Sequence, residues 1–149
     1  MKFEYERLVD APVEALWSAL TEPAAMEQHL PGGTRVTATG PEKLRVSMKI
    51  PMGFLRPTVN VDIRLSNVSL NDSFEFDFEG KAMGAGIAGT AAVAVVQDAG
   101  TNGQTRVSMN GSVQTSGLLK KVSDSKIEAA SAGFLDDYFA SVERSARQV

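Results

Sequence analysis

Between residues 36 and 115 the sequence alternates apolar and polar side chains in six runs, and near Gly117 this period of two gives way to a period of 3.6. The six runs span residues 36–38, 43–50, 58–68, 73–81, 85–97 and 105–115. Each has the length of a β-strand, and short turns join consecutive runs. Strands joined by short turns run in opposite directions, so the sequence predicts an antiparallel meander.

After residue 117 one apolar stripe recurs at helical spacing. Its members are Leu119, Val122, Ile127, Ala130, Phe134, Tyr138 and Val142. The stripe predicts a helix of about 28 residues, roughly 40 Å long at 1.5 Å per residue. Ahead of the meander, residues 3–9 have the pattern of a first strand and residues 10–30 that of two short helices. A sheet and a helix that each have one apolar face must cover each other, which predicts an α+β fold: a curved seven-stranded antiparallel sheet around a long C-terminal helix, with two short helices between strands 1 and 2.

Length and composition limit the classes of protein that the chain can represent. Its 149 residues suit a single domain spanning residues 1–149. Cysteine is absent, which excludes disulfides and thiolate nucleophiles, and the net charge of -3 argues against nucleic acid as a partner. No apolar run approaches the ~18 residues of a membrane span. The opening MKFEYERLVD lacks the apolar core of a secretory signal, so we expect a cytoplasmic protein.

Residues 84–89, GAGIAG, match the G-x-G-x-x-G pattern of dinucleotide-binding proteins. That pattern binds a pyrophosphate only between a buried parallel strand and the start of a helix. In this chain the run before GAGIAG alternates Phe with acidic residues, which is typical of a strand with one solvent-exposed face. The run after it is predicted to be another strand and not a helix. We therefore reject dinucleotide binding. The small residues of this stretch, together with EAASAG at 128–133, leave two interpretations: close packing of helix on sheet, or an internal cavity.

Three stretches carry a resemblance to a known family: APVEALWSALTEPAAMEQHLPG (11–32), FEGKAMGAGIAGTA (78–91) and DDYFASV (136–142). In these the chain resembles the CoxG family of carbon monoxide dehydrogenase subunits, within the START/Bet v 1-like helix-grip superfamily. The resemblance implies a hydrophobic pocket between sheet and helix, quinone binding, and association of a molybdenum-type carbon monoxide dehydrogenase with the membrane. Two departures are His29, where family members often have Cys before Leu-Pro-Gly, and the lack after Val149 of the membrane-directed tail that some members carry.

A pocket of this kind would be lined by apolar and small residues of the inner sheet face and the long helix. The expected ligand-binding residues are Met48, Phe54, Val61, Ile63, Phe76, Met83, Gly86, Met109, Ala130 and Phe134. Such a lining would bind a lipid-like or aromatic molecule through burial of apolar area. We expect no required cofactor, and the resemblance implies a quinone or lipid as the bound molecule. One histidine and no cysteine make a transition-metal site improbable.

The loops at one end of the predicted sheet combine apolar and basic residues, whereas those at the other end are ordinary polar turns. The expected contacts to a membrane or partner are Leu30, Met52, Phe54, Leu55, Arg56, Lys81, Leu118, Leu119, Lys120 and Lys121. An apolar patch with a cationic rim on an acidic protein suits an anionic membrane surface, at the inner face of the membrane, or an acidic partner protein. The alternative is that these side chains fold inward as a plug.

Three classes of function stay open at this point. The first is a non-enzymatic carrier of a hydrophobic molecule, which the resemblance favours. The second is a docking adaptor without a ligand, in which side chains fill the cavity. The third is a cyclase-like enzyme, for which the acid–base candidates are His29, Tyr5, Tyr138 and Asp137. An enzyme should bring polar groups together at one point of the pocket, whereas a carrier needs a mostly apolar lining.

Overall fold

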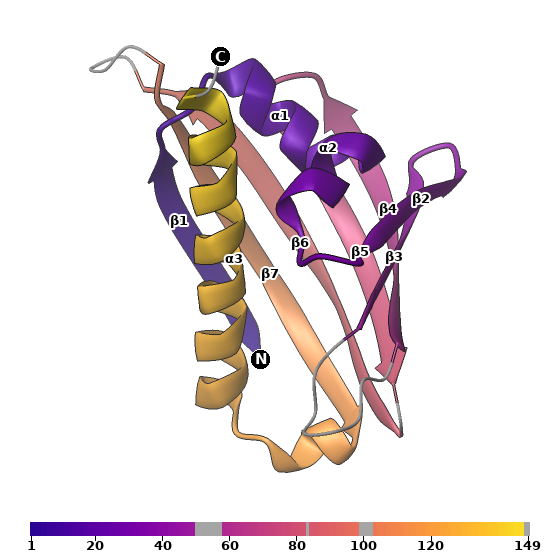
Figure 1. The fold of residues 1–149 in the computed structure, drawn as a ribbon. Helices are drawn as coiled ribbons and strands as arrows, with labels where there is room; N and C mark the ends of the chain where they lie inside the picture. Colours follow the sequence, from indigo (N-terminus) through magenta and orange to yellow (C-terminus); the bar gives the residue numbers. More distant parts are fainter. Residues whose placement is uncertain (50–57, 83, 99–102, 148–149) are drawn as a thin grey trace.

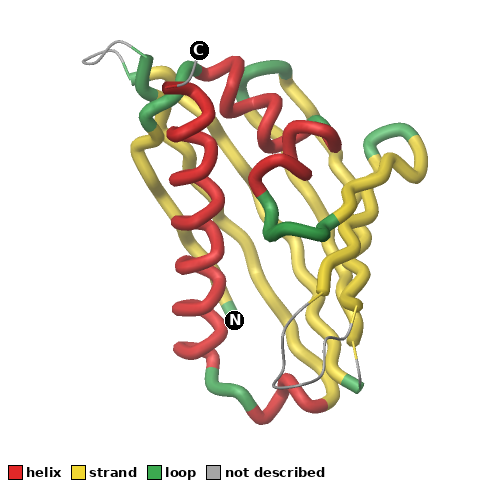
Figure 2. The backbone as a smooth tube through the Cα atoms, in the orientation of Figure 1, coloured by secondary structure: helices red, strands yellow, loops and turns green. Residues whose placement is uncertain are grey.

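The computed structural model describes residues 1–149 except 50–57, 83, 99–102 and 148–149. The described elements are β1 (Lys2–Val9), α1 (Val13–Thr21), α2 (Pro23–His29), β2 (Arg35–Gly40), β3 (Lys43–Lys49), β4 (Thr58–Ser69), β5 (Ser73–Ala82), β6 (Ala85–Gln97), β7 (Thr105–Gly117), the 3₁₀ turn η1 (Leu118–Lys121) and α3 (Asp124–Arg147). The strands form one layer and the helices lie on one side of it (Figure 2). The predicted α+β fold is confirmed.

The seven strands form one antiparallel sheet in the order β1-β7-β6-β5-β4-β3-β2. From β2 to β7 each strand pairs with the next along the chain, and β1 pairs with β7 at the far edge. The sheet is curved, and α3 crosses its inner face beside α1 and α2 (Figure 1). This is the predicted helix-grip arrangement. We call the end that holds the β4–β5 turn the upper end, and the end that holds η1 the lower end.

The inner face of the sheet has a solid upper half and a more open lower half. In the upper half Val9, Val107 and Phe139 are all 0% exposed, and the ring of Trp17 meets Phe74 edge-on with centroids 5.6 Å apart. In the lower half, inward-facing side chains such as Val61, Phe78 and Ile87 of β4, β5 and β6 are only half-buried. The sequence therefore places its closed core at one end and leaves apolar side chains facing open space at the other.

The long helix begins later than the stripe predicts. β7 ends at Gly117, whose φ of 61° ends the strand, and η1 and a short connection precede α3. The backbone N–H of Lys126 donates to the carbonyl oxygen of Ser123 at 3.1 Å and approaches its hydroxyl at 3.4 Å, a capping arrangement that sets the start of α3 at Asp124. Leu119 and Val122 therefore lie before the helix, although they continue its spacing.

The glycines of GAGIAG serve the bend and packing of the sheet. Gly84 has a φ of 79° in the turn between β5 and β6, a conformation that favours glycine. Gly89 pairs with Phe78, and a Cβ at Gly89 would come within 2.9 Å of that ring. Gly86 pairs with Lys81 and, like Ala88, occupies the alternate position that faces away from α3. Gly86 and Ala88 therefore take part neither in packing against the helix nor in the cavity, because side chains on a strand alternate between the two faces.

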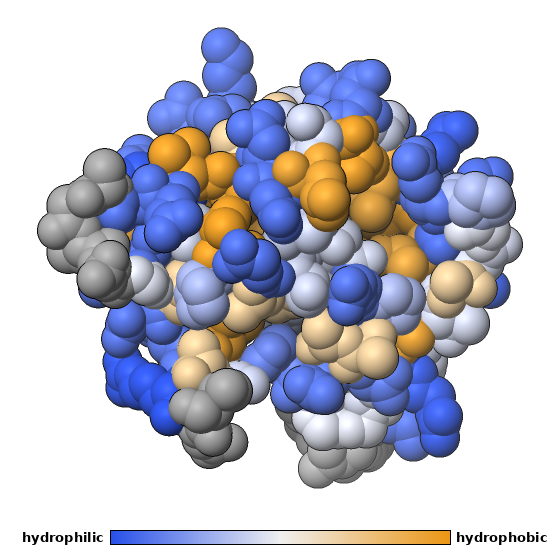
Figure 3. Space-filling view, turned by 90° about the horizontal axis from the view of Figure 1, so that it is seen from above, coloured by the Kyte–Doolittle hydropathy of each residue, from blue (hydrophilic) through white to orange (hydrophobic). Residues whose placement is uncertain are grey.

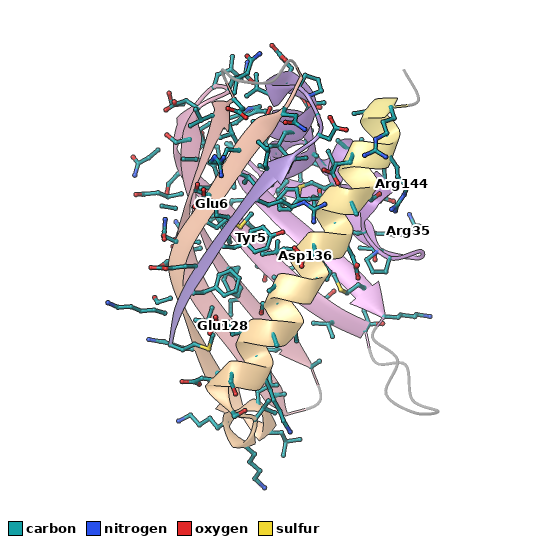
Figure 4. All side chains as sticks on the ribbon, turned by 90° about the vertical axis from the view of Figure 1, so that its left-hand side faces the viewer. Tyr5, Glu6, Arg35, Glu128, Asp136 and Arg144 are labelled. Atoms are coloured by element: carbon teal, nitrogen blue, oxygen red, sulfur yellow. The ribbon has the colours of Figure 1, made fainter. Side chains whose placement is uncertain are left out.

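Polar contacts attach α3 to β1. The guanidinium of Arg7 bonds Glu143 at 2.6 Å, and the hydroxyl of Tyr5 donates to Asp136 at 2.7 Å; Figure 4 shows Tyr5 and Asp136 between the two elements. Burial and the Asp136 carboxylate raise the pKa of Tyr5 to about 12. Burial disfavours the charged form of Glu143, but hydrogen bonds from the Asp10 N–H and Arg7 outweigh it and hold the pKa of Glu143 below its usual value. These contacts fix the upper part of α3 against the sheet edge.

Candidate functional site

A cavity of about 380 Å³ lies between the sheet and the helices α2 and α3. Its volume falls in the range of roughly 300–1,000 Å³ found for small-molecule pockets. The described lining residues are Ala19, Leu20, Met26, Leu30, Leu44, Val46, Met48, Val61, Ile63, Leu65, Phe74, Phe76, Phe78, Ile87, Val93, Met109, Phe134, Leu135, Tyr138 and Phe139. All three helices and the central strands contribute, so the cavity follows from the way α3 spans the curved sheet.

The one polar group of the described lining is a hydroxyl that already has a hydrogen-bond partner within the protein. Among the described lining residues, Tyr138 alone carries a polar side-chain atom, and its hydroxyl donates to the backbone carbonyl of Ala19. Ala19 lies in the last turn of α1, where carbonyl groups have no partner within the helix. Burial raises the pKa of Tyr138 above its ordinary value. The hydroxyl therefore stabilises the end of α1, and the rest of the described wall offers apolar contact.

Six of the ten expected ligand-binding residues lie together in this wall: Met48, Val61, Ile63, Phe76, Met109 and Phe134. Phe134 is 43% exposed although it belongs to the apolar stripe of α3. Gly86 lies on the other face of the sheet, and Ala130 is an exposed residue of α3 outside the described lining. Phe54 and Met83 lie outside the described residues.

The sequence analysis placed Met48 of β3 in the wall but missed its neighbours on the same face, and it missed the two short helices. The missed residues are Leu44 and Val46 on β3, Ala19 and Leu20 on α1, and Met26 on α2. The alternation of residues 43–49 contained the signal for β3, because Leu44, Val46 and Met48 share one face. The two short helices gave no equivalent signal, since their position over the cavity depends on the tertiary fold.

The residues expected to contact a membrane or partner divide into three groups. At the lower end Leu118 is 59% exposed, Lys81, Lys120 and Lys121 are exposed, and Leu119 is half-buried. Leu30 instead lines the cavity, where it packs against the core. The remaining four, Met52, Phe54, Leu55 and Arg56, lie outside the described residues.

The upper end is less polar than predicted. Leu70 in the β4–β5 turn is 76% exposed, and Val96 at the end of β6 is 60% exposed. Figure 3 looks onto this end and shows hydrophobic patches in orange between hydrophilic side chains in blue. The expectation of ordinary polar turns here is therefore only partly correct. Alternation along β6 places Val96 on the outer face of the sheet, where no helix packs over it.

The acid–base candidates do not converge. His29, at the end of α2, lies 2.9 Å from the Ser141 hydroxyl through Nδ1, and its ring meets Tyr138 edge-on at 5.7 Å. Burial, with Arg144 nearby, lowers the pKa of His29. Tyr5 bonds Asp136 at the opposite, β1 side of α3, and Asp137 is exposed. Thus His29 and Tyr138 are neighbours, Tyr5 lies on the other side of α3, and the four candidates do not meet at one point.

Within the described part of the chain, no group of three or more histidine, aspartate or glutamate residues could hold a metal ion. The same residues contain no helix that is both long enough and apolar enough to cross a membrane.

Solved structures share this fold at low sequence identity. A conserved protein from Geobacillus kaustophilus superposes with a TM-score of 0.87 at 11% identity, covering 99% of this chain and 96% of that one. A putative uncharacterized protein from Rhizobium leguminosarum gives 0.71 at 19% identity, covering 97% and 95%. A Rhodobacter sphaeroides protein gives 0.71 at 18%, covering 99% and 93%.

No curated protein matches the sequence. Residues 6–147 match the family described as the CoxG subunit of carbon monoxide dehydrogenase, and this match spans nearly the whole domain. The chain therefore belongs to the CoxG family of carbon monoxide dehydrogenase subunits.

Proposed function

We propose that the protein is a non-enzymatic carrier that holds a quinone or lipid-like molecule in the cavity between sheet and α3. One observation carries this proposal: the described side chains that line the cavity of about 380 Å³ are apolar except for Tyr138. The Tyr138 hydroxyl already donates its hydrogen bond to the backbone carbonyl of Ala19. Such a wall binds by removing apolar surface from water, at roughly 25 cal/mol per Å² before the costs of association are subtracted. Among the described lining residues, Tyr138 alone has a side chain that could act as an acid or a base.

The family assignment supports the second part of the proposal. Its description names a subunit of carbon monoxide dehydrogenase, so we propose that this chain associates with a molybdenum-type carbon monoxide dehydrogenase and brings it to the membrane. Co-purification of the tagged chain with such an enzyme from a producing host tests this association. Recovery of the chain without the enzyme, under conditions that preserve the enzyme, would contradict it.

Extraction and mass spectrometry of protein purified without detergent test the carrier. A denatured sample is the control, and a stoichiometric quinone or lipid is the expected result. Val61→Trp should block uptake because Val61 lines the cavity, whereas Arg64→Trp puts the same side chain on the outer face of the same strand and should leave uptake intact. Equal uptake of a short-chain ubiquinone by both variants would show that the molecule binds elsewhere.

The ligand-free docking adaptor is the alternative outcome of the same experiment. A protein that is empty after purification and takes up neither added menaquinone nor added ubiquinone would support it. The half-buried apolar side chains of the lower half argue against this alternative, because a docking module without a ligand would fill that space with side chains.

The lower end is the proposed contact with an anionic membrane. The exposed Leu118 stands beside Lys120 and Lys121 in η1, and Lys81 lies at the end of the neighbouring β5. Flotation with vesicles that contain phosphatidylglycerol should recover the protein at low salt and lose it as salt rises. Lys120→Glu combined with Lys121→Glu should abolish flotation, whereas Lys43→Glu at the upper end should not. Flotation that survives the double substitution would contradict this part of the proposal.

A further inference from the structure

A hollow of about 460 Å³ lies at the lower end of the sheet, on the face turned away from α3. Thr58, Lys81, Gly84, Gly86 and Ser116 belong to its lining. They come from the lower ends of four neighbouring strands, β4 to β7, and from the turn between β5 and β6. We call it the outer hollow, and it is separate from the cavity because the two share no described lining residue.

The strand register brings three polar side chains of the outer hollow together. Lys81 pairs with Gly86 and Gly86 with Ser116, so these residues form one row across β5, β6 and β7. Thr58 at the start of β4 lies on the same face, since Val61, three residues later, lines the cavity on the other face. Thr58, Lys81 and Ser116 are all exposed. One ammonium group and two hydroxyls are therefore accessible from the same hollow.

Gly86 keeps the floor of the outer hollow free. A Cβ at this position would collide with the hydroxyl oxygen of Ser116, so this hydroxyl lies over the glycine, above the strand that separates it from Lys81. A larger residue at position 86 would push the hydroxyl out of the row. Gly86, which takes no part in the cavity, thus leaves room for a group to approach the backbone of β6 closely.

The polar groups of the outer hollow are only weakly engaged within the protein. The Lys81 ammonium lies 3.4 Å from the Glu79 carboxylate, and the two side chains are 77% and 63% exposed. An ion pair this exposed contributes little, because water and salt screen it. Lys81 can therefore exchange this carboxylate for another anion. Neither the Thr58 nor the Ser116 hydroxyl bonds another residue within the described part of the chain, so both can donate to a ligand.

Further cations lie around the outer hollow. Lys49, at the end of β3, is exposed on the outer face next to β4. The N–H of Leu118 donates to the Gly84 carbonyl at 3.2 Å, which joins η1, with Lys120 and Lys121, to the margin of the hollow. The electrostatic field at this end of the sheet therefore favours an anion over a cation or a neutral group.

We infer that the outer hollow binds a phosphate group, with Lys81 as the counter-charge and the Thr58 and Ser116 hydroxyls as hydrogen-bond donors. Three donor groups around one open space suit the several oxygens of a phosphate, and hydrogen bonds to ionised oxygen are stronger than those between neutral groups. A phospholipid headgroup and a free phosphate ester offer the same oxygens. The position at the lower end favours the headgroup, so the inference rests on the membrane contact proposed above and names the group that it recognises.

Titration of isotope-labelled protein, followed by the shifts of its amide NMR signals, tests the site without a membrane. Glycerophosphoglycerol carries the headgroup of phosphatidylglycerol without its acyl chains, inorganic phosphate is the free anion, and glycerol has no charge. Both phosphate compounds should shift the amide signals of Gly84, Gly86 and Ser116, while glycerol should not. Shifts that are absent there, or that spread equally over exposed lysines elsewhere, would overturn the inference.

Matched substitutions identify the groups that hold the phosphate. Ser116→Ala should weaken the binding of glycerophosphoglycerol about two- to tenfold, whereas Ser112→Ala, four residues earlier on the same face of β7, should leave it unchanged. Glu79→Gln should strengthen binding about two- to fivefold because it frees Lys81, whereas Glu75→Gln further along β5 should not. Equal affinity of wild type, Ser116→Ala and Glu79→Gln would overturn the assignment.

Flotation with vesicles that contain phosphatidylglycerol distinguishes the two sources of phosphate. Weaker flotation of Ser116→Ala than of Ser112→Ala assigns the site to the lipid headgroup. Equal flotation of the two, with weaker phosphate binding by Ser116→Ala, assigns it to a free phosphate ester. Wild type that floats but shows no shifts with either phosphate compound would overturn this inference and leave the membrane contact intact. Wild type that shows the shifts but does not float would contradict the membrane contact alone.

Discussion

The Tyr138 hydroxyl should make a measurable contribution to stability because it satisfies a buried carbonyl. Ala19 is 1% exposed and its carbonyl lies in the last turn of α1, where water cannot replace the tyrosine. Tyr138→Phe removes the hydrogen bond and leaves this acceptor unpaired, at a cost of about 1–3 kcal/mol. At roughly 2–4 °C per kcal/mol for a chain of this size, the melting temperature should fall by about 2–12 °C.

Tyr5→Phe is the matched control for this prediction. It removes the same atom, but the Tyr5 hydroxyl bonds a carboxylate of Asp136 that is 58% exposed and that water can solvate. Its loss should cost less than about 1 kcal/mol. Denaturation by urea of ligand-free protein, with equal slopes for all variants, gives the comparison. A Tyr138→Phe protein no less stable than Tyr5→Phe would refute the role assigned to the buried hydroxyl.

Three further substitutions test the packing and the β1–α3 contacts. Folding lowers the pKa of Glu143 below its unfolded value of 4.5. The ionised carboxylate therefore contributes its full share of folding stability above about pH 4.5, and this share is lost as the pH falls through the pKa of the folded state. The stability gap between wild type and Glu143→Gln, measured by urea denaturation, should therefore close below about pH 4.5; a gap independent of pH would contradict this. Gly89→Ala should destabilise by about 1–3 kcal/mol because its Cβ would meet the Phe78 ring and the Ser112 carbonyl. Gly133→Ala, with no atom within 4 Å, should stabilise α3 by about 0.5–1 kcal/mol. Equal melting temperatures for these two glycine variants would refute the packing argument.

Much of the fold could be predicted because the local patterns agree with the tertiary arrangement. The run 85–97 coincides with β6, and the run 105–115 falls two residues short of β7. Period-two alternation and turn residues determine such boundaries locally. The start of α3 could not be placed by periodicity, since Leu119 and Val122 continue the helical spacing while Ser123 sets the cap.

The site was predictable only in outline. Alternation along β4 and β5 was enough to assign residues such as Val61 and Phe76 to the inner face, where both line the cavity. Within one strand the alternation alone determines which side chains share a face. Whether small residues meant close packing or empty space depends on the distance between α3 and the sheet, which no local pattern encodes.

The concentration of the closed core in the upper half of the molecule has a consequence for how such proteins can diverge. Substitutions among half-buried cavity residues such as Ile87 should disturb the packing less than substitutions at Val9 or Val107, which are fully buried and lie outside the cavity lining. If the protein is the carrier proposed above, its ligand preference can therefore change through the lower half while the upper half keeps the chain folded. The Geobacillus kaustophilus protein has the same architecture at 11% identity, so this fold persists when most of the side chains differ.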